Sequence, residues 1–352
     1  MGKGAKGMVV IREMKSDEAN RVQQLGRKAF GIVEGLFIPR PKEAIVATID
    51  DQIVGGIIVR YLVTKDKKIG YFEDAFIDPD YQGQGIGSKL YKGTTEYLWS
   101  QGCDALSGLV KDDNVGSWQL FLNNQFKRTT FGEGVRKLGF VAMLKQYFMT
   151  PFFIANGMEF YLAVKGQETE EKKVKTSHQM SLYLLFNILL LLPALCLSTQ
   201  STITFIAAYL TLLVGGMIAG YLGTLLSKRK WKFRVNTCGG VMVALINLSG
   251  VYPLCGNWYP EVYENTTSFK RDMGHQALCE WLFIIIITVI SDIWGKDSQY
   301  IQGLVHMGEI FLIYRVLNFY PFEFFGAKRV YSWRKEAYFL LSLISLGTVY
   351  ML

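Results

Sequence analysis

The chain has 352 residues, which leaves room for two domains. Lysine and arginine exceed aspartate and glutamate only by 38 to 30, and no basic stripe is interleaved with aromatic residues, so nucleic-acid binding is excluded. Five cysteines without a CxxC pair exclude a disulfide framework and a zinc knuckle. Charged and turn residues are spread over residues 1–177, whereas long apolar runs follow residue 181.

The first 77 residues alternate between strand and helix patterns. Apolar and polar residues alternate with the period of two that is typical of half-buried strands, and one segment has helical spacing. We therefore predict strands at residues 8–12, 44–50, 52–64 and 70–77, a tight turn at Asp50 and Asp51, and a helix at residues 17–30 with Ser16 as its N-cap.

A glycine-rich segment follows the last of these strands and reads Asp78-Pro79-Asp80-Tyr81-Gln82-Gly83-Gln84-Gly85-Ile86-Gly87-Ser88. Glycines let the backbone approach an anion closely, and their N–H groups form a phosphate-binding concavity in front of a helix N-terminus. We predict that helix at residues 88–101. Dinucleotide-binding proteins use a related turn, but with another spacing and within an early βαβ unit that is missing from this pattern.

The order strand, helix, three strands, glycine turn and helix is that of the GNAT (N-acetyltransferase) superfamily. Gln82-x-x-Gly85-x-Gly87 resembles the GNAT pyrophosphate motif, Q/R-x-x-G-x-G/A. After a predicted strand at residues 104–110, Asn114-Val-Gly-Ser117-Trp-Gln-Leu-Phe121 resembles the GNAT helix signature, Asn-x-x-Ala-x-x-x-Tyr. The resemblance covers residues 8–166 and implies an α+β domain at 1–166, with a mixed, mostly antiparallel sheet and flanking helices, that binds acetyl-CoA.

The resemblance also implies a set of site residues. The strand before the turn is expected to splay from its neighbour, so that the backbone of Phe76 and Ile77 binds the pantetheine arm. The cofactor-binding residues expected in addition are Gln82, Gly83, Gln84, Gly85, Ile86, Gly87 and Ser88 at the pyrophosphate, with Asn114, Ser117 and Phe121 on the following helix. No metal is expected.

Two positions bear on catalysis. Glu73 is the predicted general base, and the alternative is a strand-end carboxylate paired with a lysine. Asp74 is expected to point to the opposite face of the sheet and is the weaker candidate. The family has a tyrosine at position 121 that protonates the leaving thiolate, and Phe121 has no proton to donate.

Residues 132–157 are longer than the usual connection before the last strand, which we predict at 158–164. Their apolar residues have helical spacing and are accompanied by Arg136, Lys137 and Lys145, which favours a helix lying on a bilayer surface. The alternative is a helix packed on the sheet. Residues 167–179 are predicted to be a charged linker.

Residues 180–352 are predicted to form an all-α polytopic membrane domain. Candidate spans lie at 182–197, 203–226, 239–254, 277–294, 300–319 and 337–352. The third is interrupted by Asn247, Gly250 and Pro253. Cationic clusters at the span ends predict a cytoplasmic N-terminal domain and favour five spans, with 239–254 re-entrant, over six.

The segment from Asn318 to Gly326 weakly resembles the last core segment of site-2-type intramembrane metalloproteases. Where HExxH would fall, however, residues 216–220 read Gly-Met-Ile-Ala-Gly, and no aspartate precedes Gly326. A zinc site needs about three protein ligands. We therefore expect a pseudoprotease fold and not an active metalloprotease.

These patterns predict a membrane-bound GNAT-type N-acyltransferase. It would transfer an acyl group from acetyl-CoA to an amine of a lipid-linked or membrane-protein substrate at the cytoplasmic face, with the lipid bilayer as a further partner. The alternative is a catalytically degenerate acyl-CoA-binding sensor or scaffold with a pseudoprotease membrane domain.

Overall fold

The computed structural model of the protein describes residues 7–112, 114–167, 175–198, 201–262, 264, 266–295 and 298–351. The chain divides into two compact units. The first comprises Met1–Val110, Gly116–Pro151 and Glu159–Lys172, and the second comprises Lys111–Val115, Phe152–Met158 and Lys173–Leu352. Most of the predicted linker lies outside the described residues, and its residues 176–179 are helical, because α6 begins at Thr176.

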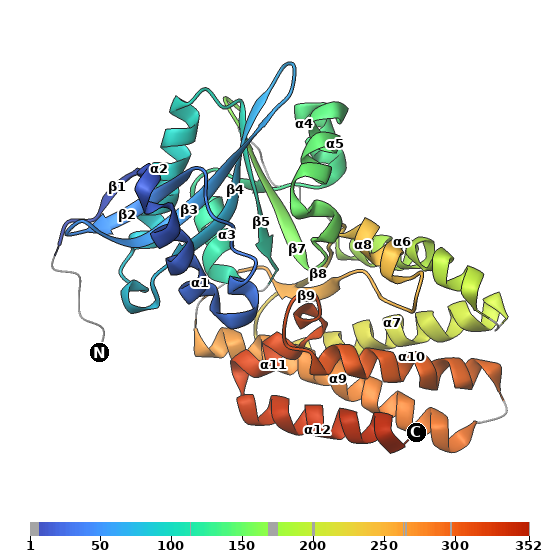
Figure 1. The fold of residues 1–352 in the computed structure, drawn as a ribbon. Coiled ribbons are helices and arrows are strands. Elements are labelled where there is room, and N and C mark those ends of the chain that lie inside the picture. The colour runs from blue at the N-terminus through green and yellow to red at the C-terminus, as the bar shows by residue number, and fades with distance from the viewer. Residues whose placement is uncertain are drawn as a thin grey trace. The chain divides into compact units, whose positions relative to one another are not determined.

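The first unit is built on a seven-stranded sheet with the order β1-β2-β3-β4-β5-β7-β6 (Figure 1). Strands β4 and β5 are parallel, whereas β1–β2, β2–β3, β3–β4 and β6–β7 are antiparallel. The strands are β1 (Val10–Glu13), β2 (Ala44–Ile49), β3 (Gln52–Val63), β4 (Lys68–Ile77), β5 (Ala105–Lys111), β6 (Lys127–Arg128) and β7 (Met158–Val164). The predicted α+β sheet is confirmed.

Helices cover the two faces of this sheet. Phe76 of β4 packs with Val22 and Leu25 of α1, whereas Phe72 packs against Tyr91 of α2 and Phe121 of α3. The helices are α1 (Ala19–Gly35), α2 (Ile86–Ser100), α3 (Val115–Asn123), α4 (Phe131–Leu138) and α5 (Phe140–Met149), with 3-10 turns η1 (Ser16–Glu18), η2 (Pro79–Tyr81) and η3 (Pro151–Ile154). Each apolar face of the sheet is thereby buried.

Several local predictions are corrected by backbone conformation. Ser16 opens η1 and is not the N-cap of α1, which starts at Ala19 and continues past a kink at Gly31, where φ is 79°. The predicted helix within residues 132–157 is two helices, because Gly139 has a φ of 89° that ends α4 and starts α5. The tight turn is confirmed, with positive φ at Asp50 and Asp51.

The second unit is a helical bundle that includes a two-stranded sheet. Its helices are α6 (Thr176–Leu197), α7 (Thr202–Thr224), α8 (Gly240–Ile246), α9 (Thr267–Trp294), α10 (Gln299–Val316), α11 (Ala327–Trp333) and α12 (Lys335–Met351), with η4 (Glu323–Phe325). Strands β8 (Trp231–Val235) and β9 (Gly256–Pro260) pair antiparallel. The prediction of an all-α domain is therefore wrong.

Glycines on α7 allow it to pack closely against α9. A Cβ added at Gly223 would lie 2.7 Å from the carbonyl oxygen of His275, and one added at Gly220 would lie 2.7 Å from Nε2 of Gln276. Small residues that let helix backbones approach are typical of helix pairs in membranes. Around this contact the core contains Trp281 and Tyr209, both fully buried.

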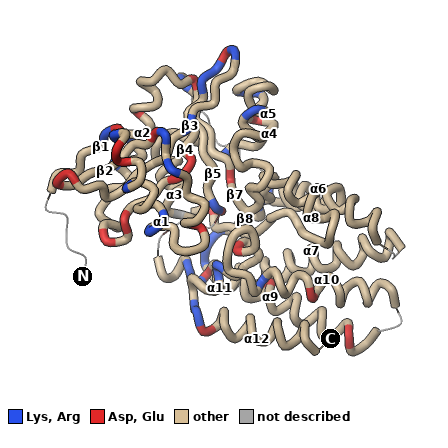
Figure 2. Tube along the Cα trace, in the orientation of Figure 1, with Lys and Arg blue, Asp and Glu red and all other residues tan. Residues whose placement is uncertain are grey.

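Three helices in the described part of the chain, α6, α7 and α9, are long and apolar enough to cross a membrane. Helices α6 and α7 contain no Asp, Glu, Lys or Arg, whereas charged residues are spread through the first unit (Figure 2). At the third candidate span, which we expected to be re-entrant, the structure has only α8 with seven residues. At 1.5 Å per residue it covers about 10 Å of a hydrocarbon core about 30 Å thick.

Candidate functional site

The glycine turn lies between β4 and α2 and has the backbone that its glycines allow. Gly83 and Gly85 have φ values of 78° and 76°, and a Cβ added at either would meet nothing within 4 Å. Helix α2 begins at Ile86, two residues before the predicted start, and Gly85 supplies no side-chain cap. The first N–H groups of a helix have no intrahelical partner, so this turn presents donors to open space.

Polar contacts hold the start of the turn in place. Lys28 of α1 binds Asp78 at 2.7 Å and Asp80 at 2.9 Å. The carboxylate of Asp78 also accepts the N–H of Asp80 at 3.1 Å. Burial alone would raise the pKa of Asp78, but these bonds outweigh it and hold the pKa below its ordinary value. Gln82 donates its side-chain amide to the carbonyl of Ile77 at 3.3 Å, which ties the turn to the end of β4.

The strands beside the turn separate as the resemblance implies. Pairing between β4 and β5 runs from Ile69–Ala105 to Phe72–Gly108 and ends there. On the β3 side, the register of β4 shifts between Ile58 and Val59, so that Glu73 is the extra residue of a β-bulge. The backbone from Glu73 to Ile77 is thus left without a partner strand on its β5 side, which is where an extended amide chain can bind.

The two carboxylates of this segment are in different states. Glu73 is held by Arg60, whose Nη2 pairs with Oε1 and whose Nε donates to Oε2 at 3.3 Å. Asp74 has no hydrogen bond or ion pair to any residue that the structure describes. Burial raises the pKa of Asp74 to about 6, although the charge of Arg60 acts in the opposite direction. An aspartate with this pKa is ionised and basic at neutral pH.

The bulge removes the basis for placing Asp74 on the opposite face from Glu73, because strand alternation fails where an extra residue is inserted. Arg60 pairs with Glu73 and also acts on the ionisation of Asp74, so both carboxylates lie near one guanidinium. The structure therefore removes the reason for ranking Asp74 below Glu73 as a candidate base. The predicted lysine partner of Glu73 is an arginine.

Comparison with known proteins agrees with this geometry. The model of the acetyltransferase (GNAT) family matches residues 12–125. This part of the chain is a GNAT domain.

The chain is 39% identical over 61 residues to the thialysine N-epsilon-acetyltransferase of Bos taurus, covering 17% of this chain and 35% of that protein. It is 30% identical over 109 residues to the enzyme of the same name from Mus musculus, covering 30% and 61%. The chain thus spans between about a third and three fifths of these relatives. A solved structure, the ribosomal-protein-S18-alanine N-acetyltransferase of Escherichia coli, is 16% identical with a TM-score of 0.33, covering 47% of this chain and all of that one.

The aromatic position of the GNAT helix signature lies in the core of the domain. Phe121 is 2% exposed, and its ring packs with those of Phe72, Phe126 and Tyr161. Its para carbon lies 2.5 Å from where a Cβ would stand on Gly108 of β5. The ring is therefore directed at the sheet backbone, which disfavours the predicted contact between Phe121 and the cofactor.

A tyrosine that the sequence reading missed lies beside Phe121. Tyr91, in the second turn of α2, stacks on Phe72, and its hydroxyl hydrogen-bonds with that of Ser117. Burial raises its pKa, so the phenol keeps its proton. Its position one turn after the glycine segment was the available signal. Asn114 belongs to the second unit and precedes α3, where its N–H donates to the carbonyl of Lys111 at 3.0 Å.

The positions of the missing protease motif are filled by helix packing. Gly216 and Gly220 of α7 lie against Glu280 and Gln276 of α9. Glu280 pairs with Arg315 at 2.7 Å. These two line a cavity of about 30 Å³, which has room for only one or two water molecules. No group of three metal-binding side chains occurs among the described residues. The site-2-type resemblance remains a prediction.

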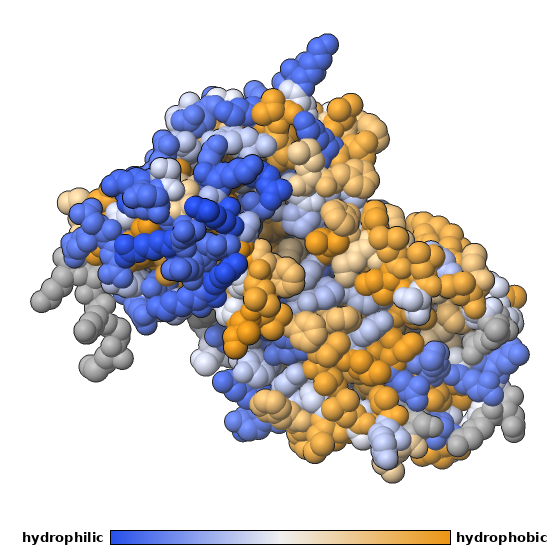
Figure 3. Space-filling view, in the orientation of Figure 1, coloured by the Kyte–Doolittle hydropathy of each residue, from blue (hydrophilic) through white to orange (hydrophobic). Residues whose placement is uncertain are grey.

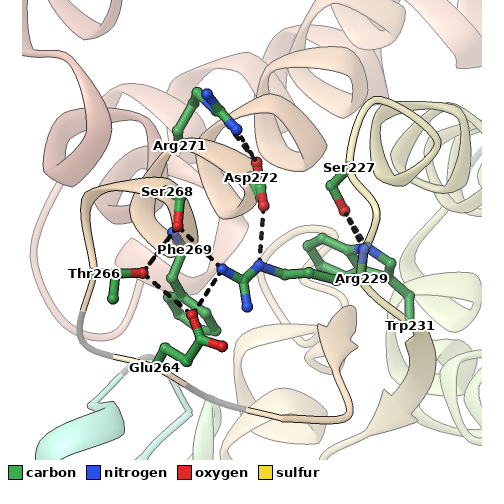
Figure 4. A network of polar contacts seen from close by, with 9 residues as sticks. All are labelled: Ser227, Arg229, Trp231, Glu264, Thr266, Ser268, Phe269, Arg271 and Asp272. Carbon is green, nitrogen blue, oxygen red and sulfur yellow. Dashed lines mark hydrogen bonds and ion pairs between the residues drawn. The ribbon is translucent and has the colours of Figure 1, made fainter.

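One of the cationic clusters at the span ends is partly folded into an ion network (Figure 4). Arg229 binds Asp272 at 2.9 Å and Glu264 at 3.0 Å, and it also donates to Ser268 at 3.2 Å. The pKa of Arg229 is raised, first by its bond to Glu264. Arg329 of the other cluster is buried and donates to Gln276 at 2.6 Å. These two arginines are structural, in addition to any part they have in topology.

Proposed function

We propose that the chain is a membrane-bound N-acyltransferase that transfers an acetyl group from acetyl-CoA to an amine. The observation that carries the proposal is the opening of β4 from β5 beside the glycine turn, with two carboxylates on the opened segment. The open space at Gly83 and Gly85 and the uncapped start of α2 fit a pyrophosphate. The backbone of Phe76 and Ile77 fits the amides of a pantetheine arm.

Within this proposal the side chains have distinct roles. The amine nitrogen attacks the thioester carbon, a C–N bond forms, the C–S bond breaks, and the ammonium proton passes to a carboxylate. Asp74 is the preferred base for two reasons. Its pKa of about 6 leaves it ionised at neutral pH, and it has no ion pair among the described residues. Glu73 is the second candidate, and Arg60 holds it in place. The thiolate leaves with its charge and takes a proton from water, since a thiol has a pKa near about 8.5.

The acceptor in this proposal is an amine of a lipid-linked or membrane-protein substrate at the cytoplasmic face. The support is the fusion of the GNAT domain to helices apolar enough to span a membrane. Figure 3 shows apolar surface over much of the second unit. The relatives named for thialysine acetylation make a lysine-like primary amine a reasonable first acceptor.

The phenylalanine at position 121, where the GNAT signature has a tyrosine, favours a second candidate function. Without a hydroxyl at this position, the GNAT domain would bind acyl-CoA and report it to the membrane unit without turnover. Such a sensor or scaffold needs the turn and the opened strands but not the carboxylates.

Purified full-length protein, incubated with radiolabelled acetyl-CoA and a native membrane extract, separates the two. Label transferred to a lipid or membrane protein, and lost in Asp74→Asn, supports the acyltransferase. Tight binding of acetyl-CoA without transfer to the extract or to a panel of soluble amines supports the sensor. Absence of acetyl-CoA binding by calorimetry rejects both.

A further inference from the structure

Helix α5 has a buried face and an apolar outward face. Ala142, Met143 and Gln146 are buried, and the amide of Gln146 donates to the hydroxyl of Ser107 on β5. The opposite face is exposed and consists of Phe140, Val141, Leu144, Phe148 and Met149. We call these five residues the α5 surface. They follow Phe140 by one, four, eight and nine residues, which places them along one side of a helix.

The α5 surface is too large and too apolar for an ordinary water-facing helix. Val141 is 72% exposed, Phe140 58% and Phe148 60%. Since a whole aromatic side chain presents about 200 Å², the two phenylalanines alone expose more than about 200 Å² of apolar surface. Contiguous apolar patches of a few hundred Å² on soluble proteins mark interaction sites. In the space-filling view, apolar surface gathers at the place of α4 and α5 (Figure 3).

The charges around the α5 surface indicate what covers it. Arg136 and Lys137 end α4, and Lys145 lies within α5, where its Nζ donates to the carbonyl of Val63. An apolar helix face accompanied by cations is typical of helices that lie in the headgroup region of anionic membranes. The described part of the chain also contains three helices that are long and apolar enough to span a bilayer, and a domain fused to such helices stays close to the bilayer.

One end of α5 is joined to the candidate catalytic carboxylates. The carbonyl oxygen of Met149, the last residue of α5, accepts Nη1 of Arg60 at 3.0 Å. The same guanidinium holds Glu73, and its charge partly opposes the rise in the pKa of Asp74 that burial causes. Arg60 therefore links the C-terminal end of α5 to the segment of β4 that has no partner strand on its β5 side.

We propose that the α5 surface lies in the headgroup region of an anionic lipid bilayer. This contact holds the Arg60 end of the GNAT domain at the membrane surface. The consequence for substrate rests on the proposed acyl transfer: an amine anchored in the bilayer reaches Asp74 along the edge of α5, whereas a fully soluble amine has no such guide.

The test measures lipid contact without using acyl transfer, so its failure is distinct from failure of the proposed function. An environment-sensitive fluorophore is attached at Phe148→Cys in full-length protein whose accessible native cysteines are serine. The matched control carries it at Lys92→Cys on α2, another exposed helix position of the same domain. Both proteins are reconstituted into phosphatidylglycerol–phosphatidylcholine vesicles with and without doxyl-labelled lipid.

We expect blue-shifted emission at position 148 and at least twofold stronger quenching by doxyl lipid there than at position 92. Val141→Asp should reduce the quenching at 148, because a carboxylate in the apolar face opposes insertion. Equal emission and quenching at the two positions would overturn the proposal. Energy transfer between labels at 148 on two copies in lipid-free detergent would also overturn it, because a second copy would then cover the face.

Discussion

Replacing Asp74 by asparagine tests which of two adjacent carboxylates is the base. A general base contributes typically 10²- to 10⁴-fold, or about 3–5 kcal/mol of transition-state stabilisation. Asp74→Asn is therefore expected to lower kcat/KM by that factor, whereas Glu73→Gln should cost less than about tenfold, because the carboxylate of Glu73 is already neutralised by Arg60. Acetyl-CoA binding should be unchanged in both variants.

The pH dependence of the acyl-transfer rate also distinguishes the two carboxylates. With a pKa of about 6, Asp74 is about nine-tenths ionised at pH 7 and about one-tenth ionised at pH 5. Acyl transfer by the wild type should thus fall about tenfold per pH unit below pH 6, and the same acid limb should remain in Glu73→Gln. Steady-state rates from pH 5 to 8 measure it. An acid limb that disappears in Glu73→Gln, with Asp74→Asn active, would refute the reasoning.

Asp74→Asn should raise the stability of the protein although it lowers the activity. The pKa of Asp74 is raised from 3.8 to about 6 on folding, so its ionisation opposes folding. About two pKa units correspond to at most about 3 kcal/mol. The contribution of Asp74 to stability is fully present below pH 3.8 and is lost as the pH rises through 6. Thermal unfolding at pH 8 should therefore show Asp74→Asn to be more stable than the wild type, and a less stable variant would show that the carboxylate is needed for packing.

Three further predictions follow from single positions. Gly85→Asp should raise the Kd for acetyl-CoA at least tenfold in calorimetry, because the new carboxylate repels the pyrophosphate. The control Gly102→Asp has the same open space and a φ of 75°, so it should share the backbone strain and bind acetyl-CoA normally. Equal binding by the two variants would exclude the turn as the site. Phe121→Tyr should destabilise the domain by about 1–3 kcal/mol, because its new oxygen meets β5 at Gly108, and a gain in kcat would show instead that the ring reaches the thioester. Ser201→Cys and Tyr350→Cys should both react with an impermeant maleimide from outside intact cells, and reaction of Tyr350→Cys only after permeabilisation would indicate six spans.

The sequence was sufficient for the elements whose signals are local. Alternation placed β2, β3 and β7 within one residue, and the glycine spacing located the turn before α2. It was insufficient where the local conformation depends on pairing with a neighbouring strand. The bulge at Glu73 depends on how β4 registers against β3, and nothing in the residues of β4 alone reveals it. That one inserted residue changed the comparison between Glu73 and Asp74.

The two-stranded sheet of the second unit was missed for another reason. In β8, Trp231, Phe233 and Val235 alternate with Lys232 and Arg234, which is a strand pattern. The cations led us to interpret the segment as a cytoplasmic loop between spans. Its partner β9 has no alternation strong enough to predict a strand, so the pairing becomes evident only from the register of Phe233 with Trp258.

The cationic clusters still indicate the membrane topology when the two structural arginines are left out. Arg229 is bound in an ion network and Arg329 is buried, but Lys228 and Lys230 in one cluster and Arg334 in the other remain exposed. Cations that flank spans favour the cytoplasmic side, so both clusters favour the same face. That requires an even number of crossings between them. Helix α8 is too short to cross, whereas α9 is long and apolar enough. An even number then requires α10 as the second crossing, which is what the five-span prediction assumes.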